Sequence, residues 1–223
     1  MKARPILMAG PMVKASLEGR KVQTRRVVAY GNSTVDGGRS KTLWNQLQWA
    51  NPENFSDSSF SDNGMPWYLH VYHSNGDTRH RVRPIYEPGD LLWVRESFAY
   101  YGMKADQVFY RATDSGNLNW RPSIHMPRRY SRFTLELTGV RVERLQEISE
   151  EDAQAEGAKA AFYRTPTNEK NVSHCGHSYK LGFVRLWESI HGVDSWDNNP
   201  WIYALAFRVH HCNVDDLTKQ ITA

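Results

Sequence analysis

The sequence predicts an α+β fold, a small and mostly antiparallel β-barrel that carries short helices. Strand-like stretches are short and irregularly spaced, as in EPGDLLWV (87–94) and WIYALAFRV (201–209). Between them lie short segments whose apolar residues have helical spacing. With 223 residues, 40% of them hydrophobic, the chain is long enough for one sizeable core. We therefore expect a single domain over residues 1–223.

The first third of the chain predicts one helix, one strand and an insertion. PMVKASLEG (11–19) is typical of a short helix, because Pro11 suits its first turn and Gly19 the position after its end. Residues 22–28 favour a strand. From about 31 to 85 Gly, Ser, Asn and Asp abound among scattered aromatic residues, which predicts an inserted, loop-rich lobe.

The remaining two thirds predict the larger part of the sheet. We expect a buried strand after a turn at Pro88 and Gly89, and further strands at 106–112, at 131–145 with a kink at Gly139, and at 201–209. SEEDAQAEG (149–157) predicts a short helix, with Ser149 as N-cap, Asp152 in the capping-box position and Gly157 after its end. A second helix is expected at 179–192, and 158–178 is expected to be loop.

Composition excludes several classes of protein. The net charge of +4 is mild, and two cysteines do not make a disulfide framework, which favours a reducing cytoplasm. Gly10 and Pro11 break the apolar N-terminal stretch, so we expect no secretory signal. No run approaches the roughly 18 apolar residues that cross a bilayer. HCGH (174–177) and HHC (210–212) match no zinc spacing, so we expect neither metal nor cofactor.

GRKVQTRR (19–26) places four cationic side chains around Thr24. Crowding and partial burial would lower the pKa of Lys21, and a neutral amine near Thr24 could activate that hydroxyl or a water. In a regular strand residues three apart face opposite ways, so the pair converges only if Lys21 sits in the turn after Gly19. The alternative from spacing alone is a basic surface strand.

Three further segments carry candidate residues. Glu156 ends the acidic helix, where a negative charge is unfavourable unless a cation such as Lys21 offsets it. Glu96 follows a buried strand, and either pairs with an arginine or faces a pocket. Residues 121–132, with Arg128 and Tyr130, suit phosphate contact and base stacking, or else form a proline-rich connection.

GRKVQTRR resembles the GxKxxTxR signature of ASCH domains, which are PUA-like β-barrels, at Gly19, Lys21, Thr24 and Arg26. EPGDLLWV, TLELTGVRVERL, EEDAQAEG and WIYALAFRV are similar to later family segments in the same order. Ala206 departs from the family, which often has Glu there. The resemblance covers residues 5–30 and 86–209, and its overall texture is similar to ASCH-like proteins of bacteriophages and prophages, which implies the host cytoplasm.

The resemblance implies an activity, since one bacterial branch of small ASCH proteins removes acetate from N4-acetylcytidine. Its catalytic Lys, Thr and Glu correspond to Lys21, Thr24 and Glu156 here. In the implied cycle Lys21 activates Thr24 for attack on the acyl carbonyl, and Glu156 handles the proton that goes to the leaving amine. The partner would be a modified nucleoside or a nucleic acid.

We also expect six residues to contact the substrate: Arg20, Arg25, Arg26, Glu96, Arg128 and Tyr130. Two alternatives remain at this point. One is a non-catalytic module that binds RNA, DNA or a modified base, and the other is a ribonuclease of the ASCH type. No coiled coil, repeat or assembly signature supports a phage structural role.

Overall fold

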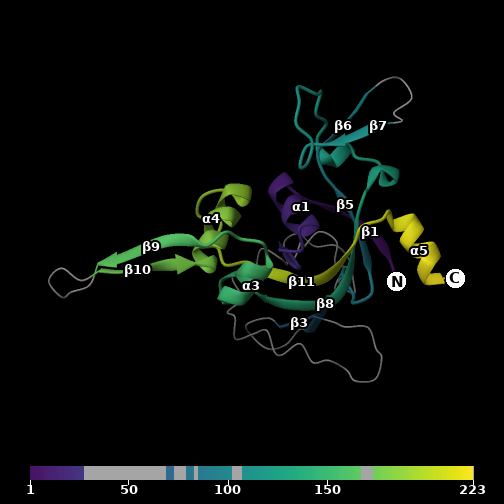
Figure 1. The fold of residues 1–223 in the computed structure, drawn as a ribbon. Coiled ribbons are helices and arrows are strands. Elements are labelled where there is room, and N and C mark those ends of the chain that lie inside the picture. The colour runs from purple at the N-terminus through teal and green to yellow at the C-terminus, as the bar shows by residue number, and fades with distance from the viewer. Residues whose placement is uncertain (28–68, 73–78, 83–84, 102–106, 167–172, 223) are drawn as a thin grey trace. The chain divides into compact units, whose positions relative to one another are not determined.

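The central element is a five-stranded sheet of order β1-β5-β8-β11-β2 (Figure 1). The computed structural model describes residues 1–27, 69–72, 79–82, 85–101, 107–166 and 173–222. β1 pairs in parallel with β5, whereas the β5–β8 and β8–β11 pairs are antiparallel. The strands of this sheet are β1 Ala3–Leu7, β2 Gln23–Val27, β5 Leu91–Arg95, β8 Thr134–Arg144 and β11 Trp201–His210.

Together with the helices, this sheet confirms an α+β fold with mainly antiparallel pairing. Within the described residues the pairing ends at β1 on one side and at β2 on the other. A closed barrel of the PUA-like type therefore stays a prediction.

Clustering of contacts divides the chain into two compact units. One comprises Met1–Arg26 with Pro88–Ala223, and the other is Val27–Glu87. The described part of the second unit is an antiparallel hairpin of β3 Leu69–Tyr72 and β4 Arg79–Val82. Most of the loop-rich lobe expected at 31–85 lies outside the described residues.

Two more hairpins belong to the first unit, and one corrects the sequence analysis. β6 Phe98–Tyr101 pairs with β7 Gln107–Tyr110, of which only β7 was expected. β9 Ala161–Pro166 pairs with β10 Ser173–Ser178, where a loop was expected. Phe162 lies opposite His177 with the ring centroids 5.6 Å apart. Cross-strand pairs of this kind stabilise a hairpin whose sequence lacks apolar alternation.

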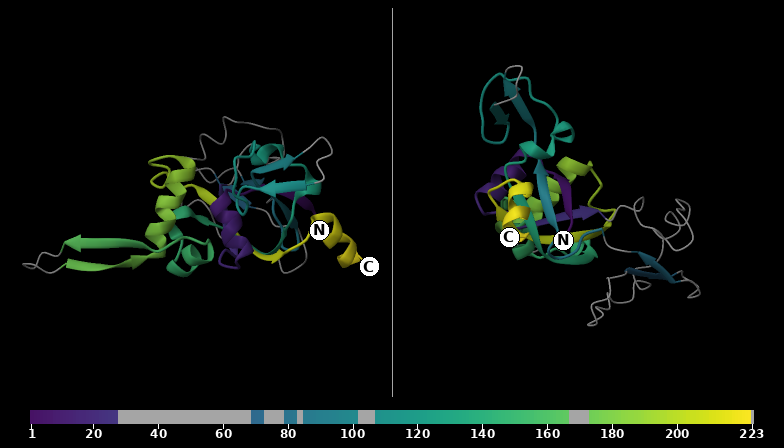
Figure 2. Two further views of the ribbon diagram at one scale, coloured as in Figure 1. Left: turned by 45° about the horizontal axis from the view of Figure 1, so that its top comes forward. Right: turned by 90° about the vertical axis from the view of Figure 1, so that its right-hand side faces the viewer.

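α1, α3 and α4, seen in two further views in Figure 2, end where glycines were expected to end them. Gly19, Gly157 and Gly192 all have positive φ, which L side chains rarely adopt. α5 was not expected, and no helix among the described residues is long and apolar enough to cross a membrane. The helices are α1 Gly10–Leu17, α3 Glu150–Ala155, α4 Tyr179–His191 and α5 Val214–Thr222, and three 3-10 turns span Ser123–His125, Arg128–Tyr130 and Leu145–Glu147.

The expected kink in the long strand is a β-bulge. Ala206 of β11 faces Gly139 of β8, but the next residue, Phe207, faces Leu137. Thr138 is therefore the extra residue, and the strand bends where Gly139 allows it.

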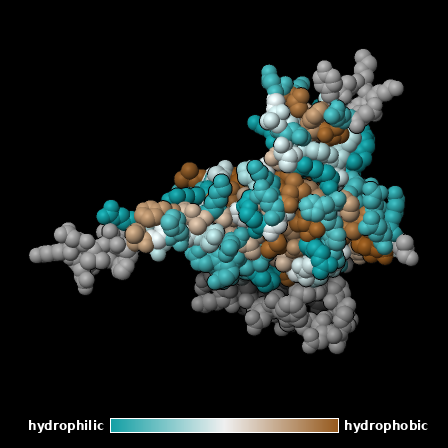
Figure 3. Space-filling view, viewed as in Figure 1, coloured by the Kyte–Doolittle hydropathy of each residue, from teal (hydrophilic) through white to brown (hydrophobic). Residues whose placement is uncertain are grey.

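α4 and α3 pack against one end of the sheet and α5 against the other. Phe183 and Trp187 of α4 are buried with Ile202 and Ala204 of β11. Val214 and Leu217 of α5 pack on Leu91 and Trp93 of β5. In the view of Figure 3 hydrophobic residues form only small patches among hydrophilic ones. Phe183 and Trp187 of α4 thus pack inside the fold, beside the site described below, whereas Ile190 is exposed.

Gly182 lets α4 lie against the chain that follows α3. A Cβ at this position would lie 1.8 Å from the carbonyl oxygen of Lys159, a backbone atom that cannot move aside cheaply. We expect Gly182→Ala to lower the free energy of unfolding by about 3 kcal/mol, the upper end of overpacking costs. Urea denaturation monitored by tryptophan fluorescence measures the change.

Gly10→Ala is the matched control, because its Cβ would meet Ala112 at an ordinary 3.9 Å. It should change the free energy of unfolding by no more than about 0.5 kcal/mol. Equal stabilities of the two variants would contradict the close approach of α4 to Lys159.

Candidate functional site

Two helix ends bring Lys21 and Glu156 together. After α1 the amide N–H groups of Gly19 and Arg20 donate to the carbonyls of Ser16 and Ala15, which is the Schellman pattern. The chain reverses there, so Lys21 lies in the turn and β2 begins only at Gln23. This is the condition that the sequence analysis set for Lys21 to face the same side as Thr24.

α3 ends in the same way. Gly157 and Ala158 donate to the carbonyls of Gln154 and Ala153, and Glu156 is the C-cap residue. The two turns touch, since a Cβ on Gly157 would lie 3.1 Å from the Cβ of Lys21. Gly157 is thus needed both for its φ of +79° and for the close approach.

Lys21 and Glu156 form a buried ion pair. Lys21 is 1% exposed and Glu156 is 3% exposed. The Nζ atom of Lys21 donates to Oε2 of Glu156 at 2.5 Å and to its carbonyl oxygen at 2.9 Å. A cation at the end of α3 offsets the unfavourable position of a carboxylate there, as expected.

Burial is the main influence on the protonation of Lys21. It lowers the pKa of Lys21 below the ordinary 10.5, Glu156 opposes the shift, and the charges of Arg26 and Arg25 add to it. The sequence predicted a lowered pKa of Lys21 mainly from crowding by arginines, whereas desolvation of the buried amine is the larger cause. The result is a lysine amine that gives up its proton more easily than a solvated one.

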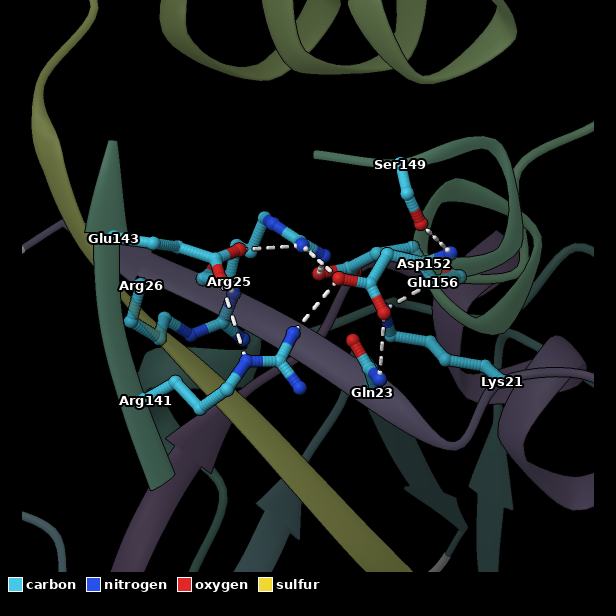
Figure 4. A network of polar contacts seen from close by, with 9 residues as sticks. All are labelled: Lys21, Gln23, Arg25, Arg26, Arg141, Glu143, Ser149, Asp152 and Glu156. Atoms are coloured by element: carbon cyan, nitrogen blue, oxygen red, sulfur yellow. Dashed lines mark hydrogen bonds and ion pairs between the residues drawn. The ribbon is translucent and has the colours of Figure 1, made fainter. Parts of the chain in front are cut away.

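Arg25 connects this pair to two more carboxylates (Figure 4). Its guanidinium, 3% exposed, donates to Glu156 at 3.2 Å, to Glu143 at 2.6 Å and to Asp152 at 2.9 Å. Arg141 also donates to Asp152, at 2.7 Å. Lys21 and Arg25 of GRKVQTRR are therefore compensated by acids from β8 and from α3 and its C-cap, which are distant in sequence.

Asp152 performs a different role from the one its position suggested. Its amide N–H donates to the Ser149 side chain at 3.1 Å, so half of the capping box is present. Its carboxylate accepts from Gln23 and Arg25 instead. Burial opposes ionisation of Asp152, but these hydrogen bonds and the positive charges of Arg25 and Arg141 outweigh it and lower its pKa.

Thr24 lines the same cavity as Lys21 and Glu156. The cavity has a volume of about 350 Å³ and lies between the β1–α1 connection, β2, the end of α3 and α4. Arg25 and Arg26 also line it. Among the described residues the Thr24 hydroxyl makes no hydrogen bond, so Lys21 and Thr24 share a cavity without a direct contact. We refer to this space as the Lys21 cavity.

α4 supplies an apolar wall that the sequence analysis did not identify. Phe183, Trp187 and His191 line the cavity, and the rings of Trp187 and His191 lie 4.1 Å apart. Burial, together with the charge of Arg26, lowers the pKa of His191. Phe183, Trp187 and His191 recur at every fourth residue, which was the available signal in the sequence. Such periodicity alone does not distinguish a helix face that packs in the core from one that lines a cavity.

Of the other residues expected to bind substrate, Arg26 lines the Lys21 cavity, whereas Arg20 and Glu96 form ion pairs outside its lining. Arg26 lines the cavity and donates to the carbonyl of Leu7 at 2.7 Å. Arg20 is half-exposed and pairs with Glu18 outside the cavity. Glu96 is buried and accepts two hydrogen bonds from Arg132. It therefore pairs with an arginine, which was the alternative to facing a pocket. Burial raises the pKa of Glu96, and the bonds and charge of Arg132 oppose this.

Arg128 and Tyr130 also lie outside the lining of the Lys21 cavity. Arg128 pairs with Asp215 of α5 at 2.7 Å. Tyr130 packs against Phe98 and accepts a hydrogen bond from Arg129. Across the part of the chain that the structure describes, no group of three His, Cys, Asp or Glu side chains is placed to hold a metal ion.

Arg25 should be essential for stability. Arg25→Ala leaves three carboxylates without their shared cation, and we expect the free energy of unfolding to fall by about 3–5 kcal/mol at neutral pH. Arg20→Ala removes an exposed pair and should cost at most about 1 kcal/mol. Urea denaturation of both variants tests this, and equal losses would contradict the role of Arg25.

The deficit of Arg25→Ala should also depend on pH. The lowered pKa of Asp152 stabilises the folded protein above its ordinary value of 3.8, and this contribution is lost as the pH falls through the folded-state pKa. The variant lacks the part of this contribution that Arg25 supplies, so its deficit should shrink below about pH 4. A deficit that stayed constant down to pH 3 would contradict this account.

Comparison of the chain with protein-family models, with curated proteins and with solved structures found no match. The ASCH resemblance therefore stays a prediction. The geometry of the Lys21 cavity is therefore the basis for assigning a function.

Proposed function

We propose that the chain is an amidohydrolase that removes an N-acyl group from a modified cytosine, with N4-acetylcytidine as the model substrate. The observation that carries the proposal is a buried lysine of lowered pKa, bonded to Glu156, on the wall of a cavity that also contains Thr24. A lysine, a carboxylate and a hydroxyl in one enclosed site are the groups that acyl transfer requires.

The proposed reaction has two steps. Thr24 Oγ1 bonds to the acyl carbon as its proton passes to neutral Lys21, and the C–N bond then breaks as the leaving amine receives a proton by way of Glu156. Water next attacks the Thr24 ester, which releases the acid and restores the hydroxyl. The first step needs Lys21 Nζ to turn from Glu156 toward Thr24 when substrate is bound, because catalytic hydrogen bonds often form only in the complex.

The walls of the cavity support an acylated pyrimidine as ligand. Phe183 and Trp187 provide an apolar surface for a planar ring. Among the described residues, Nε1 of Trp187 and Nε of Arg25 are buried donors without an acceptor. An acylated cytosine carries two carbonyl oxygens, and such acceptors would satisfy buried donors.

Lys21→Arg tests the proton transfer while it keeps the positive charge. Arginine is not deprotonated in proteins, so we expect kcat/KM for N4-acetylcytidine to fall by about 10²–10⁴. In the parent protein kcat/KM should rise with pH through the pKa of Lys21, below 10.5, since the active form is the neutral amine. Release of cytidine, followed by chromatography, measures both.

Lys219→Arg, on the exposed surface of α5, is the control and should behave as the parent protein. Circular dichroism of Lys21→Arg separates lost chemistry from lost folding. A Lys21→Arg variant that is folded and fully active would overturn the role of Lys21.

Thr24 distinguishes catalysis from binding. Thr24→Val keeps the shape of the side chain without its hydroxyl and should reduce turnover by at least about a hundredfold, whereas Thr24→Ser should retain activity within about tenfold. Mass spectrometry of parent protein quenched during turnover should detect an acylated Thr24. Full activity of Thr24→Val would exclude Thr24 as the nucleophile.

One observation favours the non-catalytic alternative. Thr24 and Lys21 make no hydrogen bond to each other, as a site that only recognises a modified base would allow. That alternative predicts that the parent protein binds N4-acetylcytidine without releasing cytidine. Isothermal calorimetry beside the turnover assay decides between the two functions.

A further inference from the structure

We infer that the substrate of the Lys21 cavity is a base within a single-stranded polynucleotide, whose phosphates bind a basic groove beside the cavity. This inference rests on the proposed function for the modified base, but the groove is argued from its own residues. The groove lies between α1, the segment that follows α3, and α4, and has a volume of about 590 Å³. Its cations are Lys14, Arg20, Lys159 and Arg185.

The charge of the groove is largely uncompensated. Lys14, Lys159 and Arg185 are exposed, and none of them forms an ion pair within the described residues. Among the described residues Glu18 is the one acid that lines the groove, and it pairs with Arg20. Like charges gathered without partners repel one another, so an anionic ligand would stabilise them. The Lys21 cavity is the opposite case, because Lys21 and Arg25 there are paired with carboxylates.

Small residues make up part of the lining of the groove. Ala158, Ala160 and Ala161 line it, and Gly182 lets Lys159 approach α4 closely. Among the described residues no aromatic side chain lines this groove. A lining without stacking surfaces suits a sugar–phosphate backbone better than it suits bases.

The groove and the cavity share part of their lining. Met12 of α1 and Leu186 of α4 line both spaces. Gly157, in the groove, follows Glu156, in the cavity, and packs against Lys21. A nucleotide whose base enters the cavity can therefore keep its neighbouring phosphates in the groove. A free nucleoside has no phosphates and would leave the groove unused.

The ligand should be single-stranded. A base enters a cavity of this kind only when it is unpaired or turned out of a duplex, and turning it out costs a few kcal/mol. RNA and DNA share the phosphate groups that the groove would bind. Parallel titrations with an RNA strand and a DNA strand therefore show which of the two is the ligand.

The test is a triple variant that removes the unpaired cations, Lys14→Ala, Lys159→Ala and Arg185→Ala. Fluorescence anisotropy measures binding of an unmodified single strand of about 12 nucleotides. We expect the slope of log affinity against log salt to fall by about 2, at roughly 0.7 for each lost phosphate contact. This corresponds to an affinity about a hundredfold weaker at 0.1 M salt.

The matched control removes three exposed cations outside the groove, with Arg111→Ala, Arg208→Ala and Lys219→Ala. It lowers the net charge equally and should bind as the parent protein does. The inference is overturned if the groove variant binds with the affinity and salt slope of the parent protein, or if the parent binds neither RNA nor DNA. It is also overturned if both triple variants lose affinity equally, because net charge then explains the binding.

Hydrolysis separates this inference from the proposed function. The parent protein should deacylate a single strand with one internal N4-acetylcytidine at a higher kcat/KM than the free nucleoside. The groove variant should lose this advantage and still hydrolyse the nucleoside as the parent does.

Equal kcat/KM for both substrates in both proteins overturns the groove while the amidohydrolase stands. No hydrolysis by the parent overturns the amidohydrolase, whereas weaker strand binding by the groove variant still supports the groove.

Discussion

The burial of a charge cluster is the constraint on which this structure depends. Lys21, Arg25 and Glu156 have almost no exposure to solvent. Removing such charges from water costs several kcal/mol for each ion, and only close pairing recovers it. β2, β8 and α3 must therefore meet in one arrangement, because each supplies a charge that the others leave uncompensated.

Backbone geometry makes that arrangement accessible. Two helices end in Schellman turns, and each turn presents one member of the central ion pair. Gly157 lets the turns touch, because a Cβ there would lie only 3.1 Å from the Cβ atoms of Ala15 and Lys21. The ion pair is thus held by main-chain hydrogen bonds on both sides, a rigid support of the kind that a reactive site requires.

Two adjacent surfaces handle charge in opposite ways. In the Lys21 cavity Lys21 and Arg25 are buried and paired with carboxylates, so their effect is to adjust protonation and to hold the carboxylates in place. In the basic groove Lys14, Lys159 and Arg185 are exposed and form no ion pair within the described residues, so they remain free to bind a polyanion. A base in the first and a backbone in the second is the division that a nucleic-acid-directed enzyme would need.

Local signals in the sequence were enough to determine the ends of α1, α3 and α4, the bulge at Gly139 and the turn that frees Lys21 from the strand. These features depend on glycine φ angles and caps within a few residues. The sequence did not indicate that Glu143 and Asp152 neutralise Arg25, that α4 walls the cavity, or that 161–178 contains a hairpin. Those outcomes depend on contacts between distant segments, and only tertiary packing decides which carboxylate meets which cation.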